Sequence, residues 1–424
     1  MNVWIRVARY SGTGALAAHT LGHMRLRIAS YNVENLFSRP RAMNQESEIA
    51  DVVLALHARI NDLLDNDAYT DADKEEILTI LGRLRLVPVD RLPEKVADRI
   101  TAAEQADGVT LPDESFAILR DIRGKLLHTP RDRAKDITVV AAGKDDFLGW
   151  VDLVRDRIEA RVIANIARVF DEVNADIVGV VEAEDRFTLK RFSETLLPDR
   201  YPHVMVIDGN DTRGIDVGVL STPQYPLQTI RSHVDDGPIG KPIFSRDCPE
   251  YAFLFPEGSE LAGQSFVVLV NHLKSKFGGN SPESVAKRRA QAEQVAAIYR
   301  RLRDEGVEHV VVLGDLNDVP GSAPLAPLLA DTDLKDISLI PADKFDDGDP
   351  DEDRPGTIGN GTKSQKIDYI LLSPALFERV SAAGIFRKGV WGGKNGDLFP
   401  HFDTIEKEHE AASDHAALYV DLEI

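Results

Sequence analysis

The sequence predicts an α/β layered sandwich, and two observations support this fold class. Short apolar stretches that read as strands alternate with amphipathic stretches that read as helices, as in α/β proteins. Several predicted strands also follow one another without a helix between them, which does not fit a strictly parallel sheet. The 424 residues suffice for two domains or for one large sandwich with insertions.

The predicted strands are apolar stretches, and several of them end in polar residues. The first, RLRIASYNVENLF, alternates apolar side chains from Leu26 to Val33. Further strands are predicted at DITVVAAG, DIVGVV, HVMVID, IDVGVLS, SFVVLVNHL, HVVVLGDLND and KIDYILLS. The stretch LVRDRIEARVIANIARVFDEV predicts a long helix that ends in a turn at Asn174, and another helix is expected over residues 285–303.

Residues 43–135 differ from the rest of the chain and predict a mostly helical insertion. Apolar residues from Ile49 to Leu64 recur with the 3.6-residue period of an amphipathic helix. The stretch TDADKEEILTILGRL predicts a second helix, with Thr70 as its N-cap and Asp73 completing a capping arrangement. The stretch DESFAILRDIRGKLL predicts a third.

The insertion is expected to interrupt one domain of residues 25–424. Met24 stands just before the first strand and is a candidate start of translation. Residues 1–24 are therefore expected to be a leader that is either disordered or not translated, and they lack the continuous apolar core of a secretory signal.

Composition narrows the class of protein. The formal net charge of −20 argues against a broad electrostatic grip on nucleic acid, although charge is uneven and the stretch NHLKSKFGGNSPESVAKRRA is basic. No apolar run approaches the roughly 20 residues of a membrane-spanning helix, so no transmembrane segment is expected. The single cysteine, Cys248, excludes an intramolecular disulfide and predicts a reducing, cytoplasmic location.

Several predicted strands end in groups suited to metal and phosphate chemistry. Each has a structural explanation if taken alone, because acids often mark the place where a strand reaches solvent and a single histidine is usually structural. Asp368 is harder to explain in this way, since a carboxylate inside KIDYILL must find a partner or shift its pKa. It is improbable that all these separate explanations hold at once. The residues are Asn32, Glu34, Glu182, Asp216, Asn271, His272, Asp315, Asn317 and Asp368, followed by Asp414 and His415 near the C-terminus.

Seven of these stretches carry a resemblance to a known family. In order, they are SYNVENLF, DIVGVVEAED, RGIDVGVLS, VNHLKSK, GDLND, KIDYILLS and SDHAAL. They resemble the successive signatures of the endonuclease/exonuclease/phosphatase superfamily, which is DNase I-like, over residues 25–39 and 152–424. The resemblance implies a four-layered α/β sandwich of two packed mixed sheets flanked by helices. The long separation of Asn32 from Glu182 departs from the compact members, and the insertion would explain it.

The resemblance also implies roles for the residues at the strand ends. Glu182 resembles the principal Mg²⁺ ligand, with Asn32, Glu34 and Asp414 near the ion. Asp315 and Asn317 resemble the pair that orients the attacking water. His415 with Asp368, and His272 with Asp216, resemble carboxylate–imidazole pairs that flank the scissile phosphate. Three basic residues, Lys274, Arg213 and Arg246, are candidate phosphate contacts.

These residue types suit hydrolysis of a phosphate ester. Mg²⁺, or Mn²⁺ as the alternative, takes oxygen ligands and needs only one or two carboxylates besides the substrate phosphate. Histidine beside a buried carboxylate favours the imidazolium, which can bind a phosphoryl oxygen or protonate the leaving group. A sulfur-rich zinc site is excluded because the chain has one cysteine.

Three functions follow, in order of preference. The first is a metal-dependent phosphodiesterase that hydrolyses nucleic acid, because VNHLKSK and the basic stretch after it resemble bacterial nuclease-like members. The second is a phosphatase or a lipid or inositol phosphoesterase of the same superfamily, although no apolar membrane-docking loop stands out. The third is a metal-binding or partner-binding module that has lost catalysis. The acidic charge balance weighs against the first function.

Overall fold

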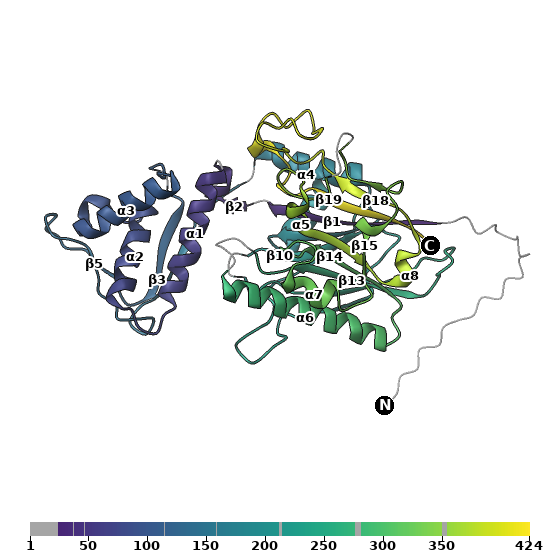
Figure 1. Ribbon diagram of the computed structural model, residues 1–424, viewed down its shortest axis with the longest axis horizontal. Coiled ribbons are helices and arrows are strands. Elements are labelled where there is room, and N and C mark those ends of the chain that lie inside the picture. The colour runs from purple at the N-terminus through teal and green to yellow at the C-terminus, as the bar shows by residue number, and fades with distance from the viewer. Residues whose placement is uncertain are drawn as a thin grey trace, which may run out of the picture.

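The computed structural model describes residues 24–36, 38–45, 47–113, 115–157, 159–211, 214–275, 281–349 and 354–424 (Figure 1). The expected leader, apart from Met24, and the candidate Arg213 lie outside these residues. None of the described helices is both long and apolar enough to cross a membrane.

Two large sheets form the centre of the molecule. The first has seven strands in the order β16-β18-β19-β1-β8-β10-β9, and the second has six in the order β11-β12-β13-β14-β17-β15. Strands β1 and β8 run parallel, as do β13 and β14, whereas most other neighbours are antiparallel. The bounds in the first sheet are β1 (Arg25–Leu36), β8 (Ile177–Ala183), β9 (His203–Ile207), β10 (Asp216–Ser221), β16 (Phe345–Asp346), β18 (Val380–Phe386) and β19 (Ala417–Glu423). Those in the second are β11 (Thr229–Arg231), β12 (Glu250–Leu254), β13 (Ser265–His272), β14 (His309–Asp315), β15 (Lys335–Asp336) and β17 (Asp368–Leu372).

Three apolar cores hold these sheets and their helices together in four layers. The central core lies between the sheets, where Ile28 and Val181 of the first share one cluster with Val268 and Val311 of the second. A second core joins the first sheet to α4 (Ala160–Val173) and α5 (Arg186–Leu196). A third joins the second sheet to α6 (Pro282–Asp304) and α7 (Ala326–Leu329). The predicted four-layered sandwich with mixed sheets is confirmed.

Local sequence explains where the covering helices begin and end. Helix α4 buries Val162, Ile166 and Phe170, which recur every three or four residues, and it ends at Asn174 in the left-handed conformation. Helix α6 begins after Ser281, whose side chain accepts a hydrogen bond from the backbone N–H of Ser284. The remaining short helices are α8 (Pro374–Phe377) and the 3₁₀ turns η1 (Arg41–Asn44), η2 (Val89–Arg91), η3 (Ala323–Leu325), η4 (Ile337–Leu339), η5 (Lys363–Gln365) and η6 (Glu408–Glu410).

A separate unit with its own core lies beside the sandwich, and we call residues 42–153 the outer unit (Figure 1). Its elements are α1 (Ser47–Leu64), α2 (Asp71–Arg83), α3 (Glu94–Asp107), β3 (Ala117–Arg123), β4 (Leu127–His128), β5 (Thr138–Val139) and β6 (Leu148–Leu153). The chain enters through β2 (Ser38–Pro40) and leaves through β7 (Arg155–Arg157), and these two strands pair antiparallel. The outer unit therefore joins the sandwich just after the carboxyl end of β1.

The outer unit corrects part of the sequence-based prediction. Helices α1 and α2 are confirmed, and Thr70 and Asp73 form the predicted capping box. The predicted helix at DESFAILRDIRGKLL is wrong, because Ala117–Arg123 is strand β3, paired with β6. Its alternation of core-facing Ala117 and Leu119 with the exposed Ile118 suits a strand, and pairing with β6 decides the outcome. Helix α3 was not predicted, and the helix expected from Leu153 begins only at Ala160.

Gly314 allows β14 to lie close to β13 just before Asp315. Its φ is +122°, and a Cβ at this position would lie 2.0 Å from the backbone oxygen of Asn271. Any side chain would force the two strands apart.

We therefore expect Gly314→Ala to lower the melting temperature more than Gly306→Ala does. Gly306 also has a positive φ, +87°, but no atom lies within 4 Å of a Cβ built there. The control thus isolates the backbone strain, which costs about 1 kcal/mol, from the steric clash. Thermal unfolding of the two variants measures the difference, and equal melting temperatures would contradict this account.

Candidate functional site

The ends of the central strands lie around one cavity. The carboxyl ends of β1, β8, β13 and β14 lie at this cavity. Strand β17 starts at the same edge, because Asp368 pairs with Asp315. Eight of the predicted site residues line this cavity, from both sheets and from the loop before β19. They are Glu34, Glu182, Arg246, His272, Asp315, Asn317, Asp414 and His415.

The backbone is distorted at three of these residues. The described part of the chain has six non-glycine residues with positive φ, and Glu34, Glu182 and Asn317 are three of them, at 47°, 66° and 54°. The register of β1 on β8 shifts between Asn32 and Leu36, and that of β10 on β8 shifts next to Glu182. Such irregularities redirect a side chain out of the regular in–out alternation. Backbone strain of this kind concentrates at functional sites.

Asp315 and Asn317 form a tight unit after β14. The backbone N–H of Asn317 donates to one carboxylate oxygen of Asp315 at 2.8 Å, and its side-chain amide donates to the other at 2.9 Å. The same amide lies 3.2 Å from the backbone oxygen of Leu273, which follows β13. The orientation of the Asp315 carboxylate is thereby fixed relative to both parallel strands.

The carboxyl group of Asp315 lies in unusual electrostatic surroundings. Burial, followed by the nearby charge of Asp368, raises its pKa to about 8, although His415 acts in the opposite direction. A carboxyl group with this pKa changes its protonation state near neutral pH, which suits a group that takes a proton from water.

His415 and Asp368 form the predicted imidazole–carboxylate contact. Nδ1 of His415 lies 2.8 Å from Oδ2 of Asp368, and the same oxygen accepts a hydrogen bond from the hydroxyl of Thr357 at 2.5 Å. Burial alone would lower the pKa of His415, but the nearby carboxylates of Asp368 and Asp414 outweigh burial and raise it well above the usual value. His415 is therefore an imidazolium at neutral pH, and its Nε2 lies 3.8 Å from Asp414.

His272 lies against the guanidinium of Arg246. Its two ring nitrogens lie 3.2 and 2.8 Å from Nε and an Nη atom of the buried Arg246. A guanidinium only donates and an imidazole keeps a proton on at least one nitrogen, so at most one of these ring nitrogens accepts from Arg246. Arg246 brings a positive charge to this place and also lies 3.6 Å from Asp211. Nε2 of His272 further lies 3.6 Å from Asp315 and 3.8 Å from Glu182.

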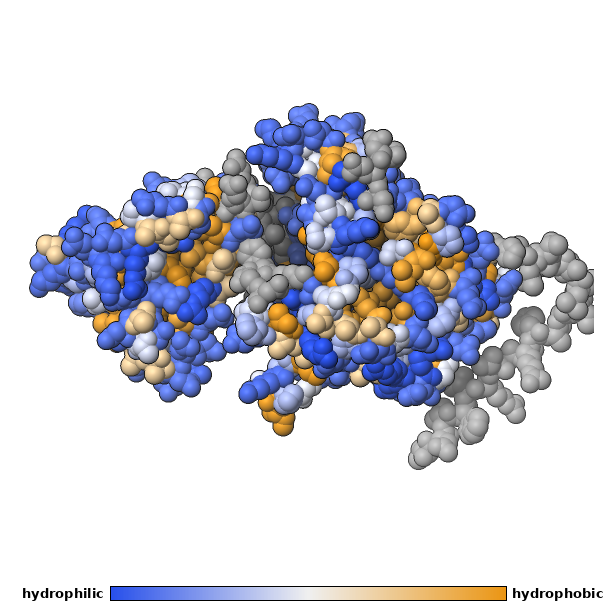
Figure 2. Space-filling view, viewed as in Figure 1, coloured by the Kyte–Doolittle hydropathy of each residue, from blue (hydrophilic) through white to orange (hydrophobic). Residues whose placement is uncertain are grey.

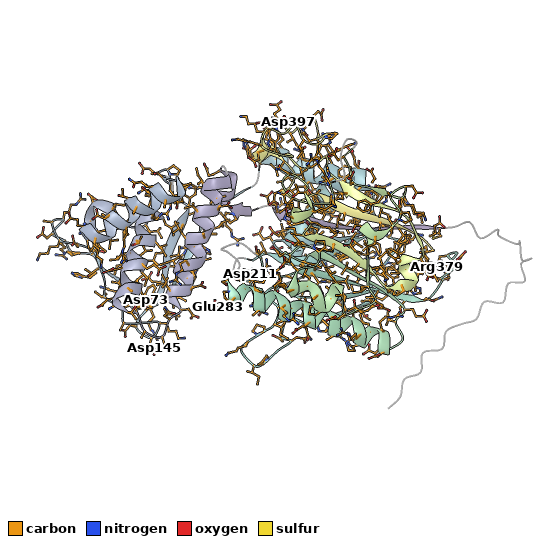
Figure 3. All side chains as sticks on the ribbon, viewed as in Figure 1. Asp73, Asp145, Asp211, Glu283, Arg379 and Asp397 are labelled. Atoms are coloured by element: carbon orange, nitrogen blue, oxygen red, sulfur yellow. The ribbon has the colours of Figure 1, made fainter. Side chains whose placement is uncertain are left out.

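Asp211 and Asp216 lie beside Arg246, and Figure 3 labels Asp211 on the side of the sandwich that faces the outer unit. Asp216 accepts a hydrogen bond from the backbone N–H of Gly209 at 2.7 Å. Burial raises its pKa to about 6. The implied pairing of Asp216 with His272 stays a prediction.

The remaining phosphate candidate within the described residues is Lys274. Its backbone N–H donates to Gln291 and its carbonyl oxygen accepts from Arg288, so α6 holds the loop after β13. Arg288 also pairs with Asp318 at 2.9 Å inside the protein, which holds the loop after β14. Helix α6 thus fixes both parallel strand ends.

Sequence patterns did not single out Arg288, Gln291 or Thr357, because each supports a functional group across a long stretch of chain.

Oxygen ligands for a cation lie beside β1. The Asn32 side-chain oxygen accepts from the backbone N–H of Glu34 at 3.0 Å, and the Glu34 carboxylate accepts from the backbone N–H of Asp414 at 3.1 Å. Ser413 completes the group by donating to the backbone oxygen of Asn32. Glu182 is adjacent, since Asn32 pairs with Val181.

This donor set fits a hard divalent cation. All its ligand atoms are oxygens, as Mg²⁺ and Mn²⁺ prefer. In addition, Nδ2 of Asn32 is buried without a hydrogen-bond partner, which leaves one donor for a water or a phosphoryl oxygen. Asp315, Asp368 and His415 also have ligand atoms within 4.8 Å of one another. That second group fits a cation less well, because His415 is positively charged and its contact with Asp368 already occupies the carboxylate.

Comparison with known protein families gives a match over much of the chain. The sequence model of the Endonuclease/Exonuclease/phosphatase family matches residues 156–415. A search of curated proteins found no match.

Similar solved structures include three proteins of low sequence identity. An endonuclease/exonuclease/phosphatase from Bacteroides vulgatus is 16% identical, with a TM-score of 0.44, over 62% of this chain and 90% of that one. The mannosyl-6-phosphatase of Bacteroides thetaiotaomicron is 15% identical, with a TM-score of 0.42, over 61% and 90%. The human Nocturnin catalytic domain is 15% identical, with a TM-score of 0.45, over 62% and 87%.

Members of the matched family are hydrolases that act on phosphate esters and typically use divalent metal ions. The match spans more than half of the chain and includes Glu182, His272, Asp315, Asp368 and His415. The chain therefore belongs to the Endonuclease/Exonuclease/phosphatase family and is a hydrolase of phosphate esters.

Proposed function

We propose that the protein is a divalent-metal-dependent phosphodiesterase that hydrolyses its substrate by in-line attack of water. The observation that carries this proposal is the gathering, around one cavity, of an oxygen donor set, a fixed carboxyl group and two kinds of positive group. A phosphoryl group needs each of these, because its hydrolysis depends mainly on positioning and on charge stabilisation. We further propose one domain of residues 25–424, with the outer unit as an insertion after β1.

Four residues would hold the cation, namely Glu182, Glu34, Asn32 and Asp414. Bound there, Mg²⁺ or Mn²⁺ would supply Lewis-acid stabilisation of charge on the phosphoryl oxygens. The crowding of carboxylates around this point also favours a cation, because unneutralised like charges repel at short distance.

The other site residues act on protons and on the phosphate. Asp315 accepts the proton of the attacking water, and Asn317 keeps its carboxylate in orientation. The His415 imidazolium, held by Asp368, binds a phosphoryl oxygen or protonates the leaving oxygen. Arg246 supplies a second positive charge and orients His272. Lys274 and Arg213 are further proposed phosphate contacts, and Asp216 is a proposed supporting carboxylate.

Nucleic acid is the substrate expected from the sequence, and a phosphatase or a lipid or inositol phosphoesterase is the alternative. Activity with Mg²⁺ or Mn²⁺ on supercoiled plasmid, on bis-p-nitrophenyl phosphate and on p-nitrophenyl phosphate separates them. Diester cleavage with little monoester cleavage supports a phosphodiesterase, and the reverse supports a phosphatase. Binding of Mg²⁺ without any cleavage would favour the inactive module.

The proposed cytoplasmic location rests on the single, buried Cys248.

We expect Asp315→Asn and His415→Gln each to lower the turnover of bis-p-nitrophenyl phosphate by about 100-fold or more, because each removes a group that moves or stabilises charge. Both replacements keep a polar side chain of similar size, so the fold should persist. The measurement is steady-state kinetics, with circular dichroism to check folding. His203→Ala, a histidine on β9 outside the cavity lining, should retain normal turnover. Normal turnover in Asp315→Asn or His415→Gln would refute the role of that residue.

Glu182→Gln tests the cation site. The amide lacks the negative charge of the carboxylate, so the half-saturating Mg²⁺ concentration for activity should rise about tenfold or more. The upward shift of melting temperature on adding Mg²⁺ to protein treated with EDTA should also shrink. Glu184→Gln, two residues further along the chain and outside the cavity lining, is the matched control. A wild-type response to Mg²⁺ in Glu182→Gln would exclude this residue as a ligand.

The pKa of Asp315 predicts a pH-dependent stability. Its folded-state pKa, about 8, exceeds the ordinary value of 3.8, so the unfolded chain loses this proton at lower pH than the folded protein does. Asp315 therefore destabilises the fold increasingly as pH rises from about 4 to about 8. In EDTA, the melting temperature of Asp315→Asn should rise relative to wild type across that range, by roughly 2 °C or more. A difference that stays constant with pH would contradict the shifted pKa.

A further inference from the structure

The cavity that contains the site has two walls from different parts of the chain. One wall carries the strand ends of the sandwich, and the other consists of α1 and β6 of the outer unit. Its volume is about 1600 Å³, well above the roughly 300–1,000 Å³ of an ordinary small-molecule site. Figure 2 shows the outer unit and the sandwich as two lobes. A substrate bound at the phosphate site would therefore extend toward the outer unit.

Helix α1 presents a polar stripe to the cavity on the face away from its own core. Its buried side, including Val53, Ile60 and Leu63, packs inside the outer unit. The residues that line the cavity recur mainly every three or four positions, as a helix face requires. The polar ones are Asp51, His57, Asn61 and Asp62 on the helix, and Asp65 directly after its end.

Aromatic side chains lie on both walls of the cavity. The chain has three tryptophans, and the two that are described, Trp150 and Trp391, both line it. Trp150 lies on β6 and is 43% exposed, so a face of its indole is accessible. Trp391 lies on the opposite wall, where its ring stacks on His401 with centroids 5.5 Å apart. Exposed tryptophan beside a phosphate site is suited to stacking on a flat ring, such as a nucleobase.

The excess of acidic residues along the cavity would repel a long polyanion. Among the described residues that line it, ten are Asp or Glu and four are Lys or Arg. Three of the four, Lys144, Arg155 and Arg246, lie within 4 Å of a carboxylate. Binding of a duplex depends on many cationic contacts along its phosphates, whereas acids of α1 line this cavity. A substrate with one or a few phosphates meets far less repulsion.

We propose that the outer unit selects short phosphodiesters that carry a flat ring next to the scissile phosphate, of mononucleotide-ester or dinucleotide size, and excludes duplex nucleic acid. Trp150 stacks on the ring, and the acids on α1 repel additional phosphates. This proposal rests on the proposed phosphodiesterase function and narrows its substrate class.

The stacking half of the proposal is tested with two esters that share a leaving group. Thymidine 5′-(p-nitrophenyl phosphate) carries a base, whereas methyl p-nitrophenyl phosphate does not. Wild type should prefer the thymidine ester in kcat/KM, and Trp150→Ala should reduce that preference about tenfold, mostly through KM. Ile122→Ala, at a 67% exposed residue of the outer unit outside the cavity lining, is the control and should keep the preference.

The outcomes separate this proposal from the proposed function. If wild type cleaves neither ester, the phosphodiesterase function fails. If it cleaves both with equal kcat/KM, or if Trp150→Ala keeps the full preference, the function stands and the stacking role is overturned.

The exclusion half is tested by reversing charge on α1. Asp62→Lys should raise plasmid nicking relative to thymidine-ester hydrolysis by about threefold or more, since it replaces repulsion with attraction near the phosphates. Asp98→Lys makes the same charge change on α3, at an exposed residue outside the cavity lining, and should leave the ratio unaltered. Equal ratios in both variants and wild type, or a wild-type kcat/KM for plasmid above that for the thymidine ester, would overturn the exclusion.

Discussion

The site depends on one constraint of topology, which is that parallel strands from two packed sheets end at the same edge. Strands β1 and β8 of one sheet and β13 and β14 of the other bring their terminal polar residues around one cavity. The close packing of the sheets keeps these ends in place, since Gly179 of β8 leaves room for Leu313 of β14. Side chains that are hundreds of residues apart in sequence therefore share one small volume without any local motif to hold them.

That convergence creates an electrostatic cost that the surrounding residues offset. Glu34, Glu182, Asp315, Asp368 and Asp414 carry carboxyl groups of like charge into a partly buried region. Burial and the charge of Asp368 raise the pKa of Asp315, and His415, whose pKa is also raised, lies beside these carboxylates together with the buried guanidinium of Arg246. The remaining negative charge lies on the side of β1, where the oxygen donors are. A cation there would complete the balance, so the same electrostatics that limit stability favour metal binding.

The sequence predicted the structure correctly where a local pattern of residue types determines the outcome. Apolar alternation identified the central strands, and polar residues at their ends identified the cavity-lining Glu182, Asp315 and His415. It failed where a distant partner decides the outcome. The stretch at Ala117 has enough apolar residues for a helix, but pairing with β6 makes it a strand. Arg246 was expected as a phosphate contact only, and its packing on His272 depends on two loops that no local pattern connects.

The position of the outer unit follows from where it enters the sandwich. The chain leaves β1 three residues after Glu34 and returns through β7 next to β2, so the inserted residues start at the rim of the site. An insertion at the opposite ends of the strands would not border the site and would add no wall to the cavity. At this end it adds a second wall to the cavity that contains the candidate site. The sandwich thus carries the residues of the candidate site, whereas the outer unit forms part of the cavity wall that a bound substrate would face.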